Sequence, residues 1–237
     1  DAEERAMTPS YSHALIIGAG RGLSASLARL FAEKGLRVSL AARTTDDLED
    51  LAGETGAGRH ACDAADPDAV AALFAALDAD GAPDVVVYNP SMRTTGRLAE
   101  LDPGQVRDAV AVTALGAFYA AREAARRMEP AGHGAILLTG ASAGVRGYPR
   151  SAPFAMGKFA LRGLAQSMAR ELHPKGVRVG HFVIDGAIRN PGREEPADGP
   201  DSMLDPDAIA RTYWHFLEQD RSALAWEIEL RPWVETF

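Results

Sequence analysis

The sequence predicts a doubly wound α/β fold, with one parallel sheet and helices on both of its faces. Short apolar segments alternate with segments of helical periodicity along the chain of 237 residues. Such alternation is typical of β–α–β crossovers, which place successive strands parallel to one another. No internal repeat, low-complexity tract or linker interrupts the pattern. We therefore expect a single domain over 13–237, large enough to bury one core.

The first half of the chain is expected to form four strands with helices between them. His13 to Ile17 is short and apolar, as in a strand that is buried on both faces. The helix after it carries leucines and Phe31 at helical spacing and stops near Gly35. The expected strands are 13–17, 37–42, 60–63 and 84–88, and the expected helices are 24–35, 44–56 and one opened by Asp66 and the proline after it.

The second half continues the alternation. A helix from about Asp102 precedes a longer helix over 109–128. Residues 186–202 are rich in glycine, proline and charge, which predicts a loop or lid. Asp205, followed by proline, predicts a last helix. The remaining expected elements are strands 135–139, 177–184 and 225–230 and a helix from Phe154 to about Leu172.

The composition argues against several kinds of partner. The net charge of −8 disfavours a nucleic-acid-binding surface, which requires clustered lysine and arginine. No apolar run is long enough to span a membrane, and we expect no metal. The lone cysteine, Cys62, fits a reducing compartment, so we expect a cytoplasmic protein. We interpret residues 1–12 as an N-terminal extension, with Met7 as the natural start and residues 1–6 as a remnant of an expression vector.

Three glycines, Gly18, Gly20 and Gly22, lie between the first apolar segment and the helix that follows it. Glycine lets the backbone approach a pyrophosphate, and a helix N-terminus offers free N–H groups. This context predicts a Rossmann-like dinucleotide site. Arg21 lies inside the turn, and Arg43 ends the second strand, where an NAD site usually places an acid. Two arginines favour NADP(H), because they suit its 2′-phosphate.

Five motifs are similar to those of one enzyme family. IIGAGRGLS resembles TGxxxGxG, CDAAD an acidic segment that contacts adenine, VVYNPS the NNAG motif, FAMGK the YxxxK motif, and VRVGHFVIDGAI the stretch VNAVAPGxI. On these motifs the chain resembles the short-chain dehydrogenase/reductase family. The resemblance implies NAD(P)(H) binding, hydride transfer to or from a small alcohol or carbonyl compound, and a homodimer or homotetramer. With the arginines, it nominates these cofactor-binding residues: Gly18, Gly20, Arg21, Gly22, Leu23, Arg43, Asp63, Asn89, Lys158, Gly186 and Ile188.

The chain departs from the family pattern where the chemistry lies. Phe154 stands at the family's tyrosine position, and Ala141 at its serine position. Thr113 aligns with the family's helix asparagine, so only Lys158 keeps its residue. The cofactor motifs depart at Ser24 for the third turn glycine, Ile17 for a threonine and Asp185 for a proline.

Phe154 has no acidic proton, so ordinary carbonyl reduction needs another proton donor. The leading hypothesis is an NADP(H)-dependent oxidoreductase with an altered active site, in which Lys158, water, Ser142 or Tyr148 replaces the missing groups. Reduction of an activated C=C or C=N bond fits these losses. Two alternatives remain open: a dinucleotide-binding protein without redox turnover, such as a sensor or scaffold, and a non-redox lyase or isomerase. The residues nominated for catalysis are Lys158, Ser142, Tyr148, Phe154, Ala141 and Thr113.

Overall fold

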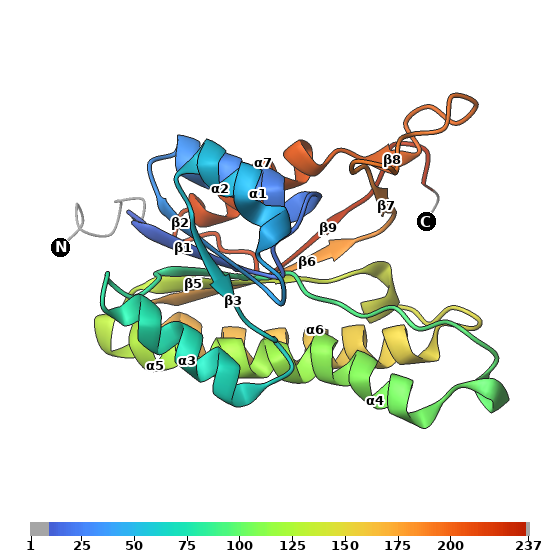
Figure 1. Ribbon diagram of the computed structural model, residues 1–237, viewed down its shortest axis with the longest axis horizontal. Coiled ribbons are helices and arrows are strands. Elements are labelled where there is room, and N and C mark those ends of the chain that lie inside the picture. Colours follow the sequence, from blue (N-terminus) through green and yellow to red (C-terminus); the bar gives the residue numbers. More distant parts are fainter. Residues whose placement is uncertain (1–9, 236–237) are drawn as a thin grey trace.

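A seven-stranded sheet forms the centre of the computed structural model, which describes residues 10–235 (Figure 1). Its strand order is β3-β2-β1-β4-β5-β6-β9, and every neighbouring pair is parallel, so the predicted fold class is confirmed. The expectations for residues 1–6 and Met7 lie outside the described residues. The strands are β1 (His13–Ile17), β2 (Arg37–Ala42), β3 (Gly58–Ala61), β4 (Val85–Tyr88), β5 (Gly134–Thr139), β6 (Val177–Ile184) and β9 (Glu227–Leu230).

Helices cover both faces of this sheet. In Figure 1, α1, α2 and α7 lie above the sheet and α3, α4, α5 and α6 lie below it. Within residues 10–235, no helix is both long and apolar enough to cross a bilayer. The helices are α1 (Leu23–Glu33), α2 (Glu49–Thr55), α3 (Pro67–Asp78), α4 (Pro103–Val110), α5 (Gly116–Ala131), α6 (Ala152–Leu172) and α7 (Pro206–Leu217).

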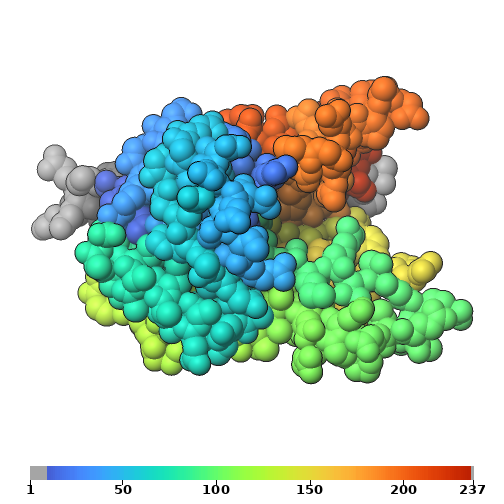
Figure 2. Space-filling model, in the orientation of Figure 1, coloured from blue at the N-terminus to red at the C-terminus, as the bar shows by residue number. Residues whose placement is uncertain are grey.

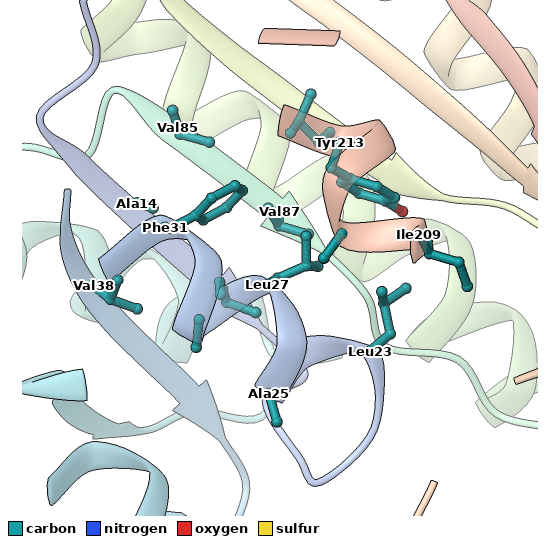
Figure 3. Close-up of a cluster of buried hydrophobic side chains, with 14 of the residues drawn as sticks. Ala14, Leu23, Ala25, Leu27, Phe31, Val38, Val85, Val87, Ile209 and Tyr213 are labelled. Atoms are coloured by element: carbon teal, nitrogen blue, oxygen red, sulfur yellow. The ribbon is translucent and has the colours of Figure 1, made fainter. Parts of the chain in front are cut away.

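Two apolar cores hold the helix layers against the sheet. One lies between the sheet and helices α1 and α7, and includes Leu27, Phe31 and Tyr213 (Figure 3). The other lies between the sheet and helices α3, α5 and α6, and includes Phe74 and Leu161. Every residue of β1 and β4 is buried, which explains why these strands are apolar without alternation. The two cores fix the sheet, whose parallel strands all end at one edge.

The three aspartate–proline pairs begin helices as predicted. The side chains of Asp66, Asp102 and Asp205 each accept a hydrogen bond from backbone N–H groups in the first turn of α3, α4 and α7. Proline follows in the first helical position, where a missing N–H costs nothing. Local sequence alone therefore fixes these three boundaries.

The two helices expected between Asp102 and residue 128 form one continuous rod instead. Helix α4 passes into α5 through a π-helical turn over Ala111–Leu115. Directly after it, Gly116 lies so close to the Tyr88 hydroxyl and the Ala64 carbonyl that a Cβ atom would clash with both. Wide turns of this kind often mark functional positions in helices.

The third strand lies two residues earlier than the predicted range of 60–63. Its pairing with β2 sets Ser39 opposite Gly58 and Ala42 opposite Ala61, and the ladder ends there because β2 ends. The position of a short, mostly polar strand therefore depends on its partner, which the sequence does not identify.

The expected loop over 186–202 contains some regular structure. Strand β7 (Ala187–Ile188) pairs with β8 (Met203–Leu204). In the segment that connects these two strands, Asn190 and Arg193 form an isolated β-bridge with each other. In Figure 2 this segment, in orange, and the green loop after β4 lie on opposite sides of a recess. The recess leads to the candidate site.

Candidate active site

Two adjoining cavities open at the carboxyl edge of the sheet, where open α/β sheets bind ligands. The first, of about 530 Å³, lies between the glycine turn, the end of β2 and the loops after β3 and β4. The second, of about 310 Å³, lies between the loop after β4, the end of β5, helix α6 and the segment after β6. Asn89 and Ser91 border both cavities. The two cavities therefore lie side by side.

The glycine turn presents backbone to the first cavity. Gly18 has φ +80°, and a Cβ atom there would lie 2.7 Å from Pro90, so the turn requires glycine. A Cβ atom on Gly20 would meet nothing within 4 Å, because this residue faces open space. Helix α1 begins at Leu23 with Gly22 at its N-cap and no side-chain cap. The uncapped helix start leaves N–H groups for an anion such as a pyrophosphate.

Ser24, at the family's third glycine position, ties the turn together. Its hydroxyl donates to the Gly18 carbonyl at 2.9 Å and accepts from the Asn89 side-chain amide at 2.7 Å. The Asn89 backbone N–H also donates to the Ile17 carbonyl at 3.0 Å. The predicted cofactor residue Asn89 thus joins the end of β4 to the turn. Sequence reasoning treated Ser24 only as a departure and missed this link.

The charged residues nominated for the first cavity differ in their surroundings. Arg43 lines the cavity, and its guanidinium has no carboxylate partner within residues 10–235. Arg21 lies 3.8 Å from Asp47, and both side chains are about three-quarters exposed. Asp63 also lines the cavity, and its carboxylate accepts a hydrogen bond from the Ala65 backbone at 3.0 Å. A surface ion pair as long as that of Arg21 contributes little.

Lys158 lies at the floor of the second cavity. Its side chain is 2% exposed, and its Nζ donates to the Thr139 carbonyl at the end of β5 at 2.7 Å. Burial lowers the pKa of Lys158 to about 7, because water no longer stabilises the charged form. The lysine is therefore held in place by α6 and β5, and it exchanges its proton near neutral pH.

Phe154 lies one helical turn before Lys158 and lines the same cavity. The Lys158 Nζ is 5.8 Å from the centre of the Phe154 ring, and the Arg93 guanidinium is 5.0 Å from it. Ala141 also lines this cavity, so the structure brings Phe154, Ala141 and Lys158 together. Arg93 was not among the nominated residues. The sequence led us to expect that the loop over 91–97, which contains it, helps to build the substrate pocket, but gave this arginine no role of its own.

The other catalytic nominations do not line either cavity. Ser142 begins a 3₁₀ turn, and its backbone carbonyl accepts hydrogen bonds from the backbone N–H groups of Val145 and Arg146. The Tyr148 hydroxyl accepts a hydrogen bond from Arg146 Nε at 2.5 Å, and the side chain is 41% exposed. Thr113 is fully buried in the π turn, and its Oγ1 accepts from the Met92 backbone N–H at 3.3 Å. Thr113 therefore acts on the loop that borders the first cavity.

The segment after β6 contributes Gly186 and Ile188 to the second cavity, as nominated. Asp185, at the family's proline position, is 4% exposed and forms an ion pair of 3.0 Å with Arg146. A second arginine, Arg231, lies 3.7 Å from the same carboxylate. The departure at Asp185 thus comes with cations that neutralise it.

A family model described as short chain dehydrogenase matches residues 12–194. The chain belongs to the short-chain dehydrogenase family. A family member from Escherichia coli (strain K12), a cyclic-di-GMP-binding biofilm dispersal mediator protein, is 34% identical over 188 residues, which cover 78% of this chain and 76% of the relative. The trans-4-hydroxycyclohexanecarboxylate dehydrogenase of Sinomonas cyclohexanicum is 32% identical over 190 residues, or 75% of this chain and 73% of that enzyme.

Solved structures of short-chain dehydrogenases share the fold over almost the whole chain. One from Rhodopseudomonas palustris is 34% identical, covers 95% of this chain and 100% of its own, and has a TM-score of 0.81. An alcohol dehydrogenase from Thermococcus sibiricus, complexed with 5-hydroxy-NADP, is 26% identical, with coverages of 96% and 99% and a TM-score of 0.84. This chain is thus similar to dehydrogenases, at least one of which was crystallised with a nicotinamide dinucleotide.

Proposed function

We propose that this short-chain dehydrogenase family member is an NADP(H)-dependent oxidoreductase with an altered active site. The first cavity fits the cofactor, because the open space at Gly20 and the uncapped start of α1 leave room and donors for a pyrophosphate. When bound, the cofactor would supply or accept a hydride. The residues that would hold it are Gly18, Gly20, Arg21, Gly22, Leu23, Arg43, Asp63, Asn89, Lys158, Gly186 and Ile188.

One observation carries the proposal: Lys158, with its lowered pKa, lies on the same cavity as Phe154 and Ala141. The aromatic ring and the methyl group stand where the family pattern has a tyrosine and a serine, and neither can donate a proton. Lys158 can hold and release one near neutral pH, directly or through water. We assign it the role of proton donor.

The preference for NADP(H) rests on Arg43. It directly follows β2, the strand whose carboxyl end meets the adenosine ribose in this fold. It lines the first cavity and has no carboxylate partner in the described part of the chain. Arg21 gives weaker support, since Asp47 competes for it. A guanidinium here would pair with a 2′-phosphate in two hydrogen bonds.

The reaction we propose is reduction of an activated C=C or C=N bond. Such a reaction delivers its proton away from a carbonyl oxygen, so it does not depend on a tyrosine hydroxyl in the usual place. The apolar surface of Phe154 and Ala141 suits a substrate that presents carbon there. Ser142 and Tyr148, which do not line the cavity, receive no role in this proposal.

Calorimetric titration of the ligand-free protein with NADPH and with NADH tests the cofactor assignment. We expect NADPH to bind at least tenfold more tightly than NADH, and Arg43→Gln to remove the difference. Arg59→Gln, which changes a nearby arginine outside the cavity lining, is the matched control. Failure of both dinucleotides to bind would refute the proposal.

A second candidate function is dinucleotide binding without turnover. Two observations favour it: the cavity floor carries Phe154 and Ala141 in place of proton donors, and the Escherichia coli relative is named for binding cyclic di-GMP. The double variant Ala141→Ser with Phe154→Tyr separates the candidates. A gain of carbonyl reductase activity in the double variant supports an enzyme whose chemistry has changed. If the protein binds NADPH tightly but no carbonyl, enoyl or imine acceptor oxidises the bound NADPH, the result supports the binding protein.

We also propose that the chain is a single domain over 13–237, that it assembles as a homodimer or homotetramer, and that it works in the cytoplasm. Large apolar side chains exposed on the rod and on α6 support assembly; they are Leu115, Phe118, Met156 and Phe159. The buried, unpaired Cys62 supports a reducing compartment. Sedimentation of the purified protein tests the assembly.

A further inference from the structure

We propose that the second cavity takes a substrate that bears a carboxylate, and that Arg93 is its anchor. This inference names the substrate class of the proposed oxidoreductase and rests on that function for the reaction itself. Its starting point is the charge of the cavity wall. The charged side chains on the wall are Arg93, Lys158 and Arg193, and no aspartate or glutamate lines it.

This excess of cations does not follow from the composition of the chain. The protein carries 33 acidic and 25 basic residues. A wall with two arginines, a lysine of lowered pKa and no acid from residues 10–235 therefore departs from the average in the opposite direction. Two of the nearby acids are paired with arginines that do not line the cavity. Asp185 pairs with Arg146 at 3.0 Å, and Asp205 pairs with Arg189 at 3.1 Å.

Arg93 is held by an aromatic ring rather than by a carboxylate. Its guanidinium lies 5.0 Å from the centre of the Phe154 ring, and it forms no ion pair within residues 10–235. On the same loop, Arg97 shows the ordinary arrangement, with Glu100 at 3.1 Å. A guanidinium stacked on a ring keeps its planar edge free, and that edge matches the two oxygens of a carboxylate.

The opposite wall of the cavity also carries positive charge. Arg193 stands on the segment after β6, where its backbone bridges Asn190. It too has no carboxylate partner among the described residues. Lys158 lies between these two sides at the floor. An anion in the cavity would therefore meet positive charge from the loop after β4, from α6 and from the segment after β6.

The size of the cavity limits the ligand. Six of the proposed cofactor-binding residues also line this cavity, so its volume of about 310 Å³ would be shared between the cofactor and the substrate. The remaining space suits a small organic acid, and the ring of Phe154 offers an apolar surface for its carbon skeleton. The acid end would meet Arg93 at one side of this ring while the reacting carbon lies over the ring towards Lys158. Arg93 would thus bind and orient the substrate, and Lys158 would remain the proton donor.

The test compares each acid with its neutral amide of nearly the same shape. Fluorine NMR of the ligand would measure binding of 4-fluorobenzoate and 4-fluorobenzamide, and of trifluorobutanoate and its amide, to the protein with and without NADP⁺. We expect at least one acid to bind tenfold or more tightly than its amide. Arg93→Met should abolish that preference and leave NADPH affinity within twofold. Arg97→Met, on the same loop but outside the cavity lining, should change neither quantity.

Equal binding of acid and amide in both pairs, or no binding of either acid, would overturn the inference. So would an acid preference that survives in Arg93→Met. Different results would refute the inference about Arg93 and the proposed oxidoreductase function. If NADPH does not bind, the oxidoreductase proposal falls, while the acid preference of the protein alone still decides whether Arg93 is an anion anchor.

Discussion

The two cavities differ in what their walls are made of. The first presents backbone groups, with Gly18 and Gly20 in the turn and Ser24 tying the turn to β4. The second presents individual side chains, with Arg93 and Lys158 both within 6 Å of the centre of an apolar ring. A backbone site survives many substitutions as long as its turn keeps its shape. A side-chain site changes its chemistry with one substitution, and this is where we propose that the active site is altered.

The largest effect is expected from a pair of glycine substitutions in the first cavity. Gly18→Val places a Cβ atom against Pro90 at a positive φ, so it should destabilise the fold by about 1–3 kcal/mol and abolish NADPH binding. In Gly20→Ala the added Cβ atom would have no neighbour within 4 Å, so the unfolding temperature should stay unchanged and only the affinity for NADPH should fall. Thermal unfolding and calorimetry measure the two quantities. If both variants lost the same stability and the same NADPH affinity, the shape of the glycine turn would not be what forms the wall of the first cavity.

The second prediction concerns the pH dependence of stability through Lys158. Its folded-state pKa is about 7, below the unfolded value near 10.4, so the folded state loses this proton first. Burying the cation therefore costs stability fully below pH 7, and the cost fades as pH rises towards 10. In that window the free energy of unfolding should rise relative to Lys158→Met, with a limiting slope of about 1.4 kcal/mol per pH unit.

Urea unfolding of both proteins at several pH values would measure this slope. His181 does not obscure it, because burial lowers the pKa of that imidazole and keeps it neutral above pH 7. A difference between the proteins that stays constant from pH 7 to 10 would show that Lys158 titrates normally, and the second cavity would lose its proton donor.

The third prediction compares two arginines at the first cavity. Arg43→Gln should weaken NADPH binding about tenfold, as expected for the loss of one charge-assisted contact, and leave NADH unchanged. Arg21→Gln should have a smaller effect, because Asp47 lies 3.8 Å from it and part of its charge is already compensated. Dissociation constants of NADPH, measured by calorimetry at one salt concentration, would show which arginine contributes more to the affinity. A larger loss in Arg21→Gln would reverse the assignment.

A smaller effect than that of Gly18→Val is expected at Ser24. Ser24→Gly restores the family's third glycine but removes the hydroxyl between Gly18 and Asn89, leaving a partly buried amide without its partner. The variant should lose about 1–2 kcal/mol of unfolding free energy. Ser26→Gly, in the same helix and with no side-chain link to the turn, controls for the helix propensity of glycine. Equal losses in the two variants would mean that the link adds nothing.

Sequence reasoning located most of the fold. Strands β1, β2 and β6 have the predicted bounds, because apolar runs between turn residues determine them locally. The starts of α3, α4 and α7 follow from aspartate–proline pairs. The bounds of β3 and the joining of α4 to α5 were predicted wrongly, since both depend on contacts with distant segments.

For the site, the sequence by itself determined the glycine turn and the spacing that brings Phe154 to Lys158. The second follows from helical periodicity, whereas the place of Ala141 was expected from the family resemblance. Only the tertiary structure decided that Thr139 fixes the lysine amine, that Ser24 links to Asn89, and that Arg93 stacks on Phe154. Each of these contacts joins residues 19 or more positions apart, so it depends on how the elements pack and not on any local pattern.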